Sequence, residues 1–336
     1  MRKYDIYGMG NALVDIEFKV SDAFLEKHDI EKGFMTLVGE KKQTTLVNEF
    51  NGGSEGAKAC GGSAANTIIG ASYFGAKCFY SCKVADDEFG HFYRDDMAAA
   101  NVDSNLIGTL PKGVTGKCLV MVSPDAERTM NTHLGISETL SEYELDVDAL
   151  KNSKYFYAEG YSVTSDSARA AVKKAMEIAK EHGVRTSMTF SDPAIVTYFK
   201  DGLNELIGNG VDLLFCNKEE AMVWADTSDF ETALSALKSI AKTYVVTLGA
   251  EGALIFDGNI NFTIDTKSVQ AVDTTGAGDL FAGAYLYGIT NGLNERESGK
   301  LACEAASSVV EKVGPRLPKK QCQSLLYEFE RHIVRR

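Results

Sequence analysis

Short apolar runs alternate with stretches of helical periodicity along most of the chain, and this alternation determines the predicted fold. From about residue 150 onward, the expected strands are residues 155–158, 185–190, 213–216, 244–248 and 252–256, and the expected helices are residues 167–182, 201–209 and 229–241. Residues 62–75 and 87–100 show the same helical spacing. Strand, helix and strand in this order predict right-handed βαβ units and a mainly parallel sheet covered by helices on both faces. The predicted fold class is α/β.

The N-terminal third has a different pattern, with short strands separated by turns. The expected strands are residues 15–20, 33–38, 115–122 and 128–133, with a hairpin turn at residues 124–127 between the last two. Glu17 and Lys19 alternate with apolar neighbours, which is typical of a sheet with one solvated face. We expect a small four-stranded β lid made of residues 15–38 and 113–137. It would cover the mouth of a larger α/β core made of residues 1–14, 39–112 and 138–336.

Composition and charge narrow the class of protein. The chain has 336 residues, 44% of them hydrophobic and 24% charged, which is ordinary for a soluble globular enzyme. A net charge of −12 argues against binding to nucleic acid or to acidic membranes. The chain has no run of 18 apolar residues and no signal-peptide core at its start, and its seven cysteines lie mostly in apolar segments. We expect a cytoplasmic protein with reduced thiols and a small-molecule substrate.

The segment from Asp273 to Asp279, with the sequence Asp-Thr-Thr-Gly-Ala-Gly-Asp, is the most informative stretch. It follows a strand-like alternation at residues 267–272 and precedes an apolar helical run that starts at Leu280. Its glycines allow a tight turn whose N–H groups converge, and a helix N-terminus adds positive potential there. Asp279 would place a carboxylate beside this anion hole, where it could accept a proton from an attacking hydroxyl. We predict an active site suited to a phosphate.

This glycine-rich turn has other interpretations. An Asp early in a helix often only caps the helix. A dinucleotide-binding loop would need glycine at position 281, which is Phe281. A Walker A loop would need a glycine five residues before a Gly-Lys pair, and neither such pair in the chain has one. The predicted phosphate loop is therefore of another kind.

Polar residues that follow strand ends are candidates for nucleotide binding, because open α/β sheets bind ligands at that edge. Asn217 and Glu220 follow residues 213–216. Asn217 could cap the next helix, and Glu220 could hold Mg²⁺ through water; a plain capping pair is the alternative. Thr247, Gly249 and Gly252 follow the strand at residues 244–248 and could admit phosphates or ribose, or they could form an ordinary turn.

A second group of residues is suited to an alcohol acceptor. Gly61, Gly62 and Asn66 begin a predicted helix, so they offer backbone donors and an amide to substrate hydroxyls. Asp15 lies at the end of a predicted strand, where its carboxylate could accept two hydrogen bonds from a diol. The sequence thus supplies donors and acceptors for a hydroxylated ring.

These segments together resemble the ribokinase/PfkB carbohydrate kinase family, and within it the adenosine kinase branch. The matching segments are residues 10–16, residues 61–67, Asn217-x-x-Glu220, Thr247-x-Gly249-x-x-Gly252 and residues 273–279, in family order. The resemblance covers residues 4 to about 330. It implies a ribokinase-like, Rossmann-type three-layer core with a small β lid. It also implies transfer of the ATP γ-phosphate to a primary hydroxyl.

The resemblance implies a role for each matching residue in the reaction itself. Asp279 would be the catalytic base, and the amides of Gly276, Ala277 and Gly278 would form the anion hole. Many members also bind K⁺ beside this loop, and Asp273 and Thr275 fit that pattern. On the predicted lid, Arg128 could move in to pair with the transferring phosphate, with an exposed lid charge as the alternative.

The resemblance also divides the binding residues between the two substrates. Those implied for ATP are Thr247, Gly249 and Gly252, with Asn217 and Glu220 organising Mg²⁺ through water. The residues implied to bind the ring hydroxyls of the acceptor are Asp15, Gly62 and Asn66. Gly61, which precedes Gly62, belongs to the same substrate-binding group.

The identity of the acceptor is the least determined point. Tyr161 lies where the adenosine branch places an aromatic side chain against the base, and Phe18 and Phe34 could add to an aromatic slot. Core packing is the alternative for all three. Residues 191–195 depart from the eukaryotic adenosine kinase pattern, which has an aromatic residue after its proline. We expect adenosine as the acceptor, and ribose, fructose or another nucleoside are the alternative acceptors. A further hypothesis is that the chain is a ligand-binding protein without catalytic activity. Both a monomer and a lid-paired homodimer are compatible with the sequence.

Overall fold

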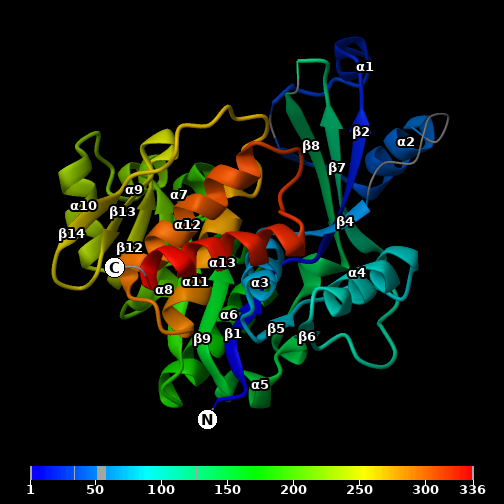
Figure 1. The fold of residues 1–336 in the computed structure, drawn as a ribbon. Coiled ribbons are helices and arrows are strands. Elements are labelled where there is room, and N and C mark those ends of the chain that lie inside the picture. Colours follow the sequence, from blue (N-terminus) through cyan, green and yellow to red (C-terminus); the bar gives the residue numbers. More distant parts are fainter. Residues whose placement is uncertain (1, 34, 51–57, 126, 335–336) are drawn as a thin grey trace.

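A nine-stranded sheet forms the centre of the larger part of the molecule (Figure 1). The computed structural model describes residues 2–33, 35–50, 58–125 and 127–334. The strands follow the order β14 (Asn261–Ile264), β13 (Ala253–Phe256), β12 (Ala241–Thr247), β11 (Val211–Asn217), β10 (Arg185–Thr189), β9 (Ser153–Glu159), β1 (Tyr4–Met9), β5 (Cys78–Ser81) and β6 (Val102–Ser104). All neighbours from β12 to β6 are parallel. The predicted mainly parallel sheet is confirmed.

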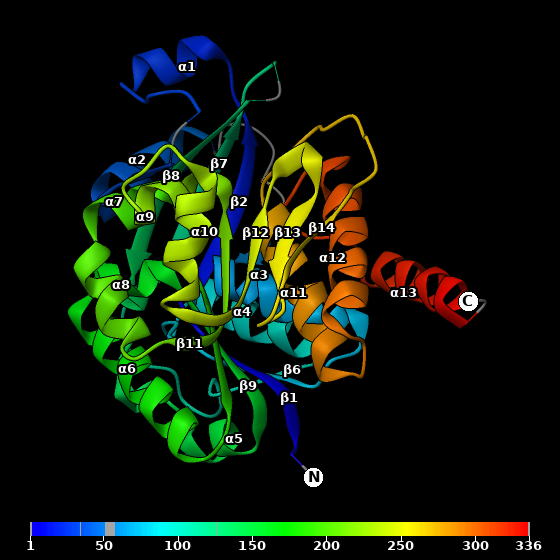
Figure 2. The same ribbon diagram turned by 90° about the vertical axis from the view of Figure 1, so that its left-hand side faces the viewer.

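Helices cover both faces of this sheet and complete three layers (Figure 2). One face carries α3 (Ser63–Phe74), α4 (Glu88–Ala99), α11 (Ala277–Thr290), α12 (Glu295–Val310) and α13 (Lys319–Val334). The other carries α5 (Val147–Lys151), α6 (Asp166–Glu181), α7 (Pro193–Tyr198), α8 (Lys200–Ile207), α9 (Lys218–Trp224) and α10 (Phe230–Lys238). Along β9, Tyr155 and Tyr157 enter the first core, whereas Phe156 and Ala158 enter the second. A sheet buried on both faces explains why its strands are apolar runs.

A smaller second sheet stands beside the end of the core where β1 passes into β2 (Figure 1). Its order is β3 (Met35–Leu37), β8 (Arg128–Gly135), β7 (Thr115–Val122), β2 (Leu13–Lys19) and β4 (Lys58–Gly61), with α1 (Asp22–Lys27) and α2 (Glu40–Phe50) in the intervening chain. The predicted count of four strands was wrong, because β4 is a short strand immediately before α3 and shows no alternation. The predicted solvated face is confirmed: Ile16 and Phe18 are buried, and Lys19 is exposed.

The hairpin predicted between β7 and β8 is confirmed for its described residues. Val122 pairs with Arg128, and the N–H of Ser123 donates to the carbonyl of Glu127 at 3.0 Å. Residue 126 lies outside the described residues.

One strand prediction in the C-terminal part of the chain was wrong. Residues 267–272 form no strand, because most of these side chains are exposed and no neighbouring surface buries an alternating face. The strand predicted at residues 252–256 is confirmed as β13. It pairs with β12 in the antiparallel direction, because the short segment between them leaves no room for a crossover helix. Among the described residues, no helix has the length and apolar character needed to cross a membrane.

Candidate active site

Asp279 lies in the first turn of α11 and is held by two side chains from α3. Ser63 Oγ donates to its Oδ1 at 2.6 Å, and Asn66 Nδ2 donates to its Oδ2 at 3.1 Å. The residue is only partly exposed, and its carboxyl group lies among protein atoms of α3 and α11. This burial raises the pKa of Asp279 to about 6, against the two hydrogen bonds, which lower it. Two hydrogen bonds therefore fix the orientation of the Asp279 carboxylate, which is partly accessible and basic enough to accept a proton near neutral pH.

The turn before Asp279 adopts the predicted tight geometry at one glycine. Gly276 has a φ of 73°, and a Cβ there would clash with the carbonyl oxygen of Pro315, so only glycine fits. The N–H of Ala277 is already engaged, since it donates to the Thr274 carbonyl at 3.2 Å. The N–H groups of Gly276, Gly278 and Asp279 have no hydrogen-bond acceptor among the described residues. The amides free for an anion are thus those of 276, 278 and 279, rather than of 276–278.

Asp15 and the glycines of the β4–α3 junction come together beside Asp279. Asp15 pairs with Ala59 of β4, and its carboxyl group lies directly over Gly61, where an added Cβ would clash with Oδ1. Gly62 has a φ of 101° and caps α3. Burial raises the pKa of Asp15 to about 7, against Arg316 and Arg128, while Asp279 raises it further. The predicted acceptor residues Asp15, Gly61, Gly62 and Asn66 are therefore brought to one place.

Glu159 is a site residue that the sequence reasoning missed. It ends β9, is fully buried, and accepts hydrogen bonds from the N–H groups of Asn11 at 2.8 Å and Ala64 at 2.7 Å. Burial raises its pKa to about 7, and Asp279 contributes in the same direction. Glu159 thereby joins the β1–β2 connection to the start of α3. A carboxylate at the end of an otherwise apolar strand was the available signal.

Arg128 connects the second sheet to the glycine-rich loop. It pairs with Glu17 Oε2 at 2.5 Å and with Asp273 Oδ2 at 2.8 Å, and its side chain is only 9% exposed. The alternative of an exposed lid charge was wrong, because the acidic neighbours on both sides bury the guanidinium. Because Arg128 links the small sheet to the glycine-rich loop, its ion pair with Asp273 is suited to being exchanged for a pair with a phosphate.

The residues predicted to bind K⁺ do not offer a free anionic oxygen in this arrangement. Asp273 Oδ1 accepts from the N–H of Thr275 at 2.9 Å, and Oδ2 accepts from the N–H of Gly314 at 2.7 Å as well as pairing with Arg128. The guanidinium already balances the carboxylate charge. The geometry does not fit a cation at this side chain.

Asn217 and Glu220 form a reciprocal cap at the start of α9. The Glu220 N–H donates to Asn217 Oδ1 at 2.8 Å, and the Asn217 N–H donates to Glu220 Oε2 at 2.9 Å. Burial raises the pKa of Glu220 to about 7, and the negative charge of Asp192 adds to the increase. Two hard carboxylates at adjoining strand ends fit a hydrated Mg²⁺. Capping and metal binding are therefore compatible, and Asp192 is a residue that the sequence reasoning did not assign to this role.

Thr247, Gly249 and Gly252 lie next to this cap on the same sheet edge. Thr247 pairs with Asn217 in register at the ends of β12 and β11. Gly249 has a φ of 61° with open space at its Cβ position, whereas a Cβ at Gly252 would clash with the carbonyl oxygen of Ile264. Gly249 thus leaves clearance for a ligand, and Gly252 is required by packing.

Tyr161 follows the end of β9 and lies near four of the acidic groups of the site. Burial raises its pKa, and Asp192, Asp279, Glu159 and Glu220 add to the increase in that order. The ring is half-buried and packs on the core that contains Phe190 and Trp224. Phe18 is buried in the other core, so core packing accounts for it. Phe34 lies outside the described residues.

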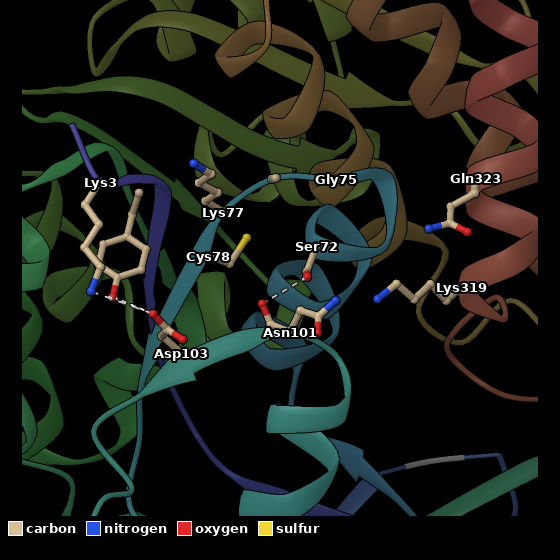
Figure 3. Close-up of a pocket in the computed structure, with 11 residues that line it drawn as sticks. Lys3, Ser72, Gly75, Lys77, Cys78, Asn101, Asp103, Lys319 and Gln323 are labelled. Atoms are coloured by element: carbon tan, nitrogen blue, oxygen red, sulfur yellow. Dashed lines mark hydrogen bonds and ion pairs between the residues drawn. The ribbon is translucent and has the colours of Figure 1, made fainter. Parts of the chain in front are cut away.

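A surface hollow of about 500 Å³ lies apart from these residues and contains none of them (Figure 3). It adjoins the amino ends of β1 and β5 and is lined by Lys3, Lys77, Lys319 and Asp103, among others. Its carboxylate is already paired, because Tyr4 Oη donates to Asp103 at 2.7 Å and Lys3 lies 3.9 Å away. The candidate site is therefore at the opposite, carboxyl edge of the sheet.

Comparison with known proteins agrees with this assembly. The chain matches the pfkB family of carbohydrate kinases across residues 35–322. The chain belongs to the PfkB family. The crystal structure of adenosine kinase from Sinorhizobium meliloti superposes on this PfkB chain with a TM-score of 0.88 and 35% identity, covering 97% of this chain and 99% of that one.

Curated relatives divide between two substrate classes. Adenosine kinase of Saccharomyces cerevisiae is 29% identical, over 92% of this chain and 96% of its own length. Probable fructokinase-4 of Arabidopsis thaliana is 32% identical, over 80% of this chain and 88% of its own length. This PfkB protein is an ATP-dependent kinase whose acceptor is a nucleoside or a sugar, and its fold is ribokinase-like.

Proposed function

We propose that this PfkB kinase transfers the γ-phosphate of ATP to the primary hydroxyl of a nucleoside, with adenosine as acceptor and AMP as product. The observation that carries the proposal is the placement of Asp279. Its carboxylate is held by Ser63 and Asn66 beside free main-chain amides at the start of α11. Tyr161, half-buried among the site carboxylates, supplies an aromatic surface for a flat base.

The proposed reaction needs placement and charge neutralisation more than covalent help. Asp279 accepts the proton of the acceptor hydroxyl as its oxygen attacks the γ-phosphorus, and ADP leaves on the opposite side. The free N–H groups at the start of α11 stabilise the charge on the transferring group. Arg128, released from Asp273, pairs with the same group. Mg²⁺, held through water by Glu220 and Asp192, would neutralise the phosphates of ATP.

The dependence of the rate on pH tests the role of Asp279. Its pKa of about 6 means that it loses its base function by protonation as the pH falls below that value. We expect kcat/KM for the acceptor to fall by at least about tenfold per pH unit below about pH 6, because Asp15 is protonated there as well. Stability should change in the opposite direction. Because burial raises the folded-state pKa of Asp15, Glu159, Glu220 and Asp279, the stability that they contribute is present at low pH and is lost as the pH rises through about 6 to 7.

The measurements are a pH–rate profile and melting temperatures at pH 5.5 and 7.5. Activity lost at pH 5.5 with an unchanged or higher Tm supports the assignment. Activity that falls only together with the folded fraction contradicts it.

A panel of acceptors decides the substrate. ATP consumption would be measured with adenosine, other nucleosides, ribose and fructose at matched concentrations. We expect the highest kcat/KM with adenosine. A higher value for fructose or ribose favours the second candidate, a sugar kinase. That candidate is supported by the fructokinase relative and by residues 191–195, which depart from the eukaryotic adenosine kinase pattern. If no acceptor exceeds the background rate, both proposals fail.

A further inference from the structure

A cavity of about 330 Å³ lies at the amino ends of β9, β10, β11 and β12, next to α11 and the start of α12. Among the described residues that line it, none belongs to the candidate active site, which lies at the carboxyl ends of these strands. Tyr285 and Ile289, one turn apart on α11, form part of its wall. The cavity is therefore separate from the candidate active site, although α11 borders both.

The phenol of Tyr285 is an unsatisfied polar group in the wall of this cavity. Tyr285 is only 1% exposed, and its Oη is buried with no hydrogen-bond partner among the described residues. The ring is well packed, since its centroid lies 5.7 Å from that of Phe215 and 6.3 Å from that of Phe281. A phenylalanine would make the same ring contacts without a buried, unpaired hydroxyl, which is costly. The hydroxyl therefore calls for a polar partner supplied from the cavity.

Two side chains of opposite charge line the same cavity without pairing with each other. Arg185, the first residue of β10, donates from Nη1 to the phenol oxygen of Tyr155 at 3.1 Å, and forms no ion pair within the described parts of the chain. Glu295, in the first turn of α12, has a carboxylate that accepts no hydrogen bond and forms no ion pair with a described residue. The cavity thus separates a guanidinium from a free carboxylate.

The other charged groups at this cavity are already satisfied. Lys242 pairs with Asp212 Oδ1 at 2.7 Å, and Asp212 Oδ2 accepts from the N–H of Thr186 at 2.8 Å. An apolar part of the wall is formed by Leu213, Ile289 and Leu293. The wall therefore offers a ligand one guanidinium, one carboxylate, one phenol and an apolar surface.

We propose that this cavity binds a small zwitterion, namely an α-amino acid with an apolar side chain. The carboxylate of the ligand pairs with Arg185, and its ammonium group pairs with Glu295. The Tyr285 hydroxyl gains its missing partner in either of these two groups, and the apolar wall takes the side chain. A ligand with a single charge would leave Arg185 or Glu295 unpaired, so the site selects for both charges. This inference goes beyond the proposed function and does not depend on it.

Calorimetric titration of the whole protein tests the site, with L-leucine and L-phenylalanine as probes. Two analogues of leucine each lack one charge: 4-methylpentanoate has no ammonium group, and 3-methylbutylamine has no carboxylate. We expect leucine to bind with a Kd of about 1 mM or lower, and each analogue to bind at least about tenfold more weakly. Adenosine with a non-hydrolysable ATP analogue should not displace leucine, because the cavity is separate from the candidate active site.

Three variants determine where leucine binds. Arg185→Met and Glu295→Gln should each weaken binding at least about tenfold, and Tyr285→Phe should weaken it about three- to tenfold. Without ligand, Tyr285→Phe should have the Tm of the wild type or a higher one, because it removes an unsatisfied hydroxyl. Glu231→Gln is the matched control for Glu295→Gln, since Glu231 also lies in the first turn of a helix, α10, on the other face of the sheet. The control should bind leucine like the wild type.

The inference is overturned if leucine binds equally to the wild type and to the three cavity variants, or if the ATP analogue displaces it. It also fails if neither amino acid binds at about 10 mM, in which case water alone serves the Tyr285 hydroxyl. Analogues that bind as tightly as leucine would rule out selection for a zwitterion. None of these measurements requires turnover, so a failure of the proposed function would leave their result unchanged.

Discussion

Asp279→Asn is expected to lower kcat by about 10³–10⁴-fold while ATP affinity stays within a few-fold of the wild type. In free energy this is about 4–5.5 kcal/mol of lost transition-state stabilisation. The amide cannot accept the proton of the acceptor hydroxyl, but it keeps the size of the carboxylate. Its surroundings can also adapt. Asn66 Oδ1 is buried and has no hydrogen-bond partner within the described parts of the chain. A flip of the Asn66 amide would let this oxygen accept from the amide that replaces the Asp279 carboxylate.

The measurement combines initial rates with calorimetric titration of a non-hydrolysable ATP analogue. Asp166→Asn is the matched control, because Asp166 also lies in the first turn of a helix, on the exposed face of α6. A normal rate in Asp279→Asn, or a loss of ATP binding and of Tm together, would show that Asp279 is a helix cap and no base.

Most of the large sheet was predictable because burial on both faces leaves a direct trace in the sequence. β9 and β11 read as apolar runs since every second side chain enters a different core. The glycine-rich loop was predictable for another reason. Only glycine fits at position 276, because the φ there is 73° and Pro315 lies against the residue. This requirement for glycine is visible in the sequence of the loop itself.

Contacts that form only after folding left no such trace. Arg316 and Asp96 are 220 positions apart in the sequence. Arg128 lies in the small sheet, whereas its partner Asp273 lies in the glycine-rich loop of the large core. Neither pair therefore has a periodic or local signature in the sequence. β4 is stabilised by its pairing with β2, and four residues before a helix are too few to show alternation. For a similar reason, the sequence did not indicate that the N–H of Ala277, one of the predicted anion-hole amides, is engaged in this structure. The Thr274 carbonyl takes its N–H when the turn closes, a detail set by backbone geometry.

Gly278→Ala is the prediction that separates chemistry from folding most cleanly. Gly278 lies in the first turn of α11, its φ is not in the left-handed region, and an added Cβ meets no atom within 4 Å. Alanine favours a helix over glycine by up to about 1 kcal/mol, so we expect Tm to stay the same or rise. In the proposed mechanism, the methyl group would nevertheless project from the turn that carries the free N–H groups, into the space that the transferring phosphate needs. We expect kcat/KM to fall about 10²–10³-fold.

Two glycines serve as references for that experiment. Gly39→Ala adds a methyl group into equally open space away from the site and should leave the rate unchanged. Gly276→Ala should lower Tm as well as activity, because the left-handed backbone and the Pro315 contact exclude a side chain. Rates and melting curves of the three variants would be compared. If Gly278→Ala works as well as Gly39→Ala, the open space above the start of α11 is not the path of the phosphate, and the free amides there have no catalytic role.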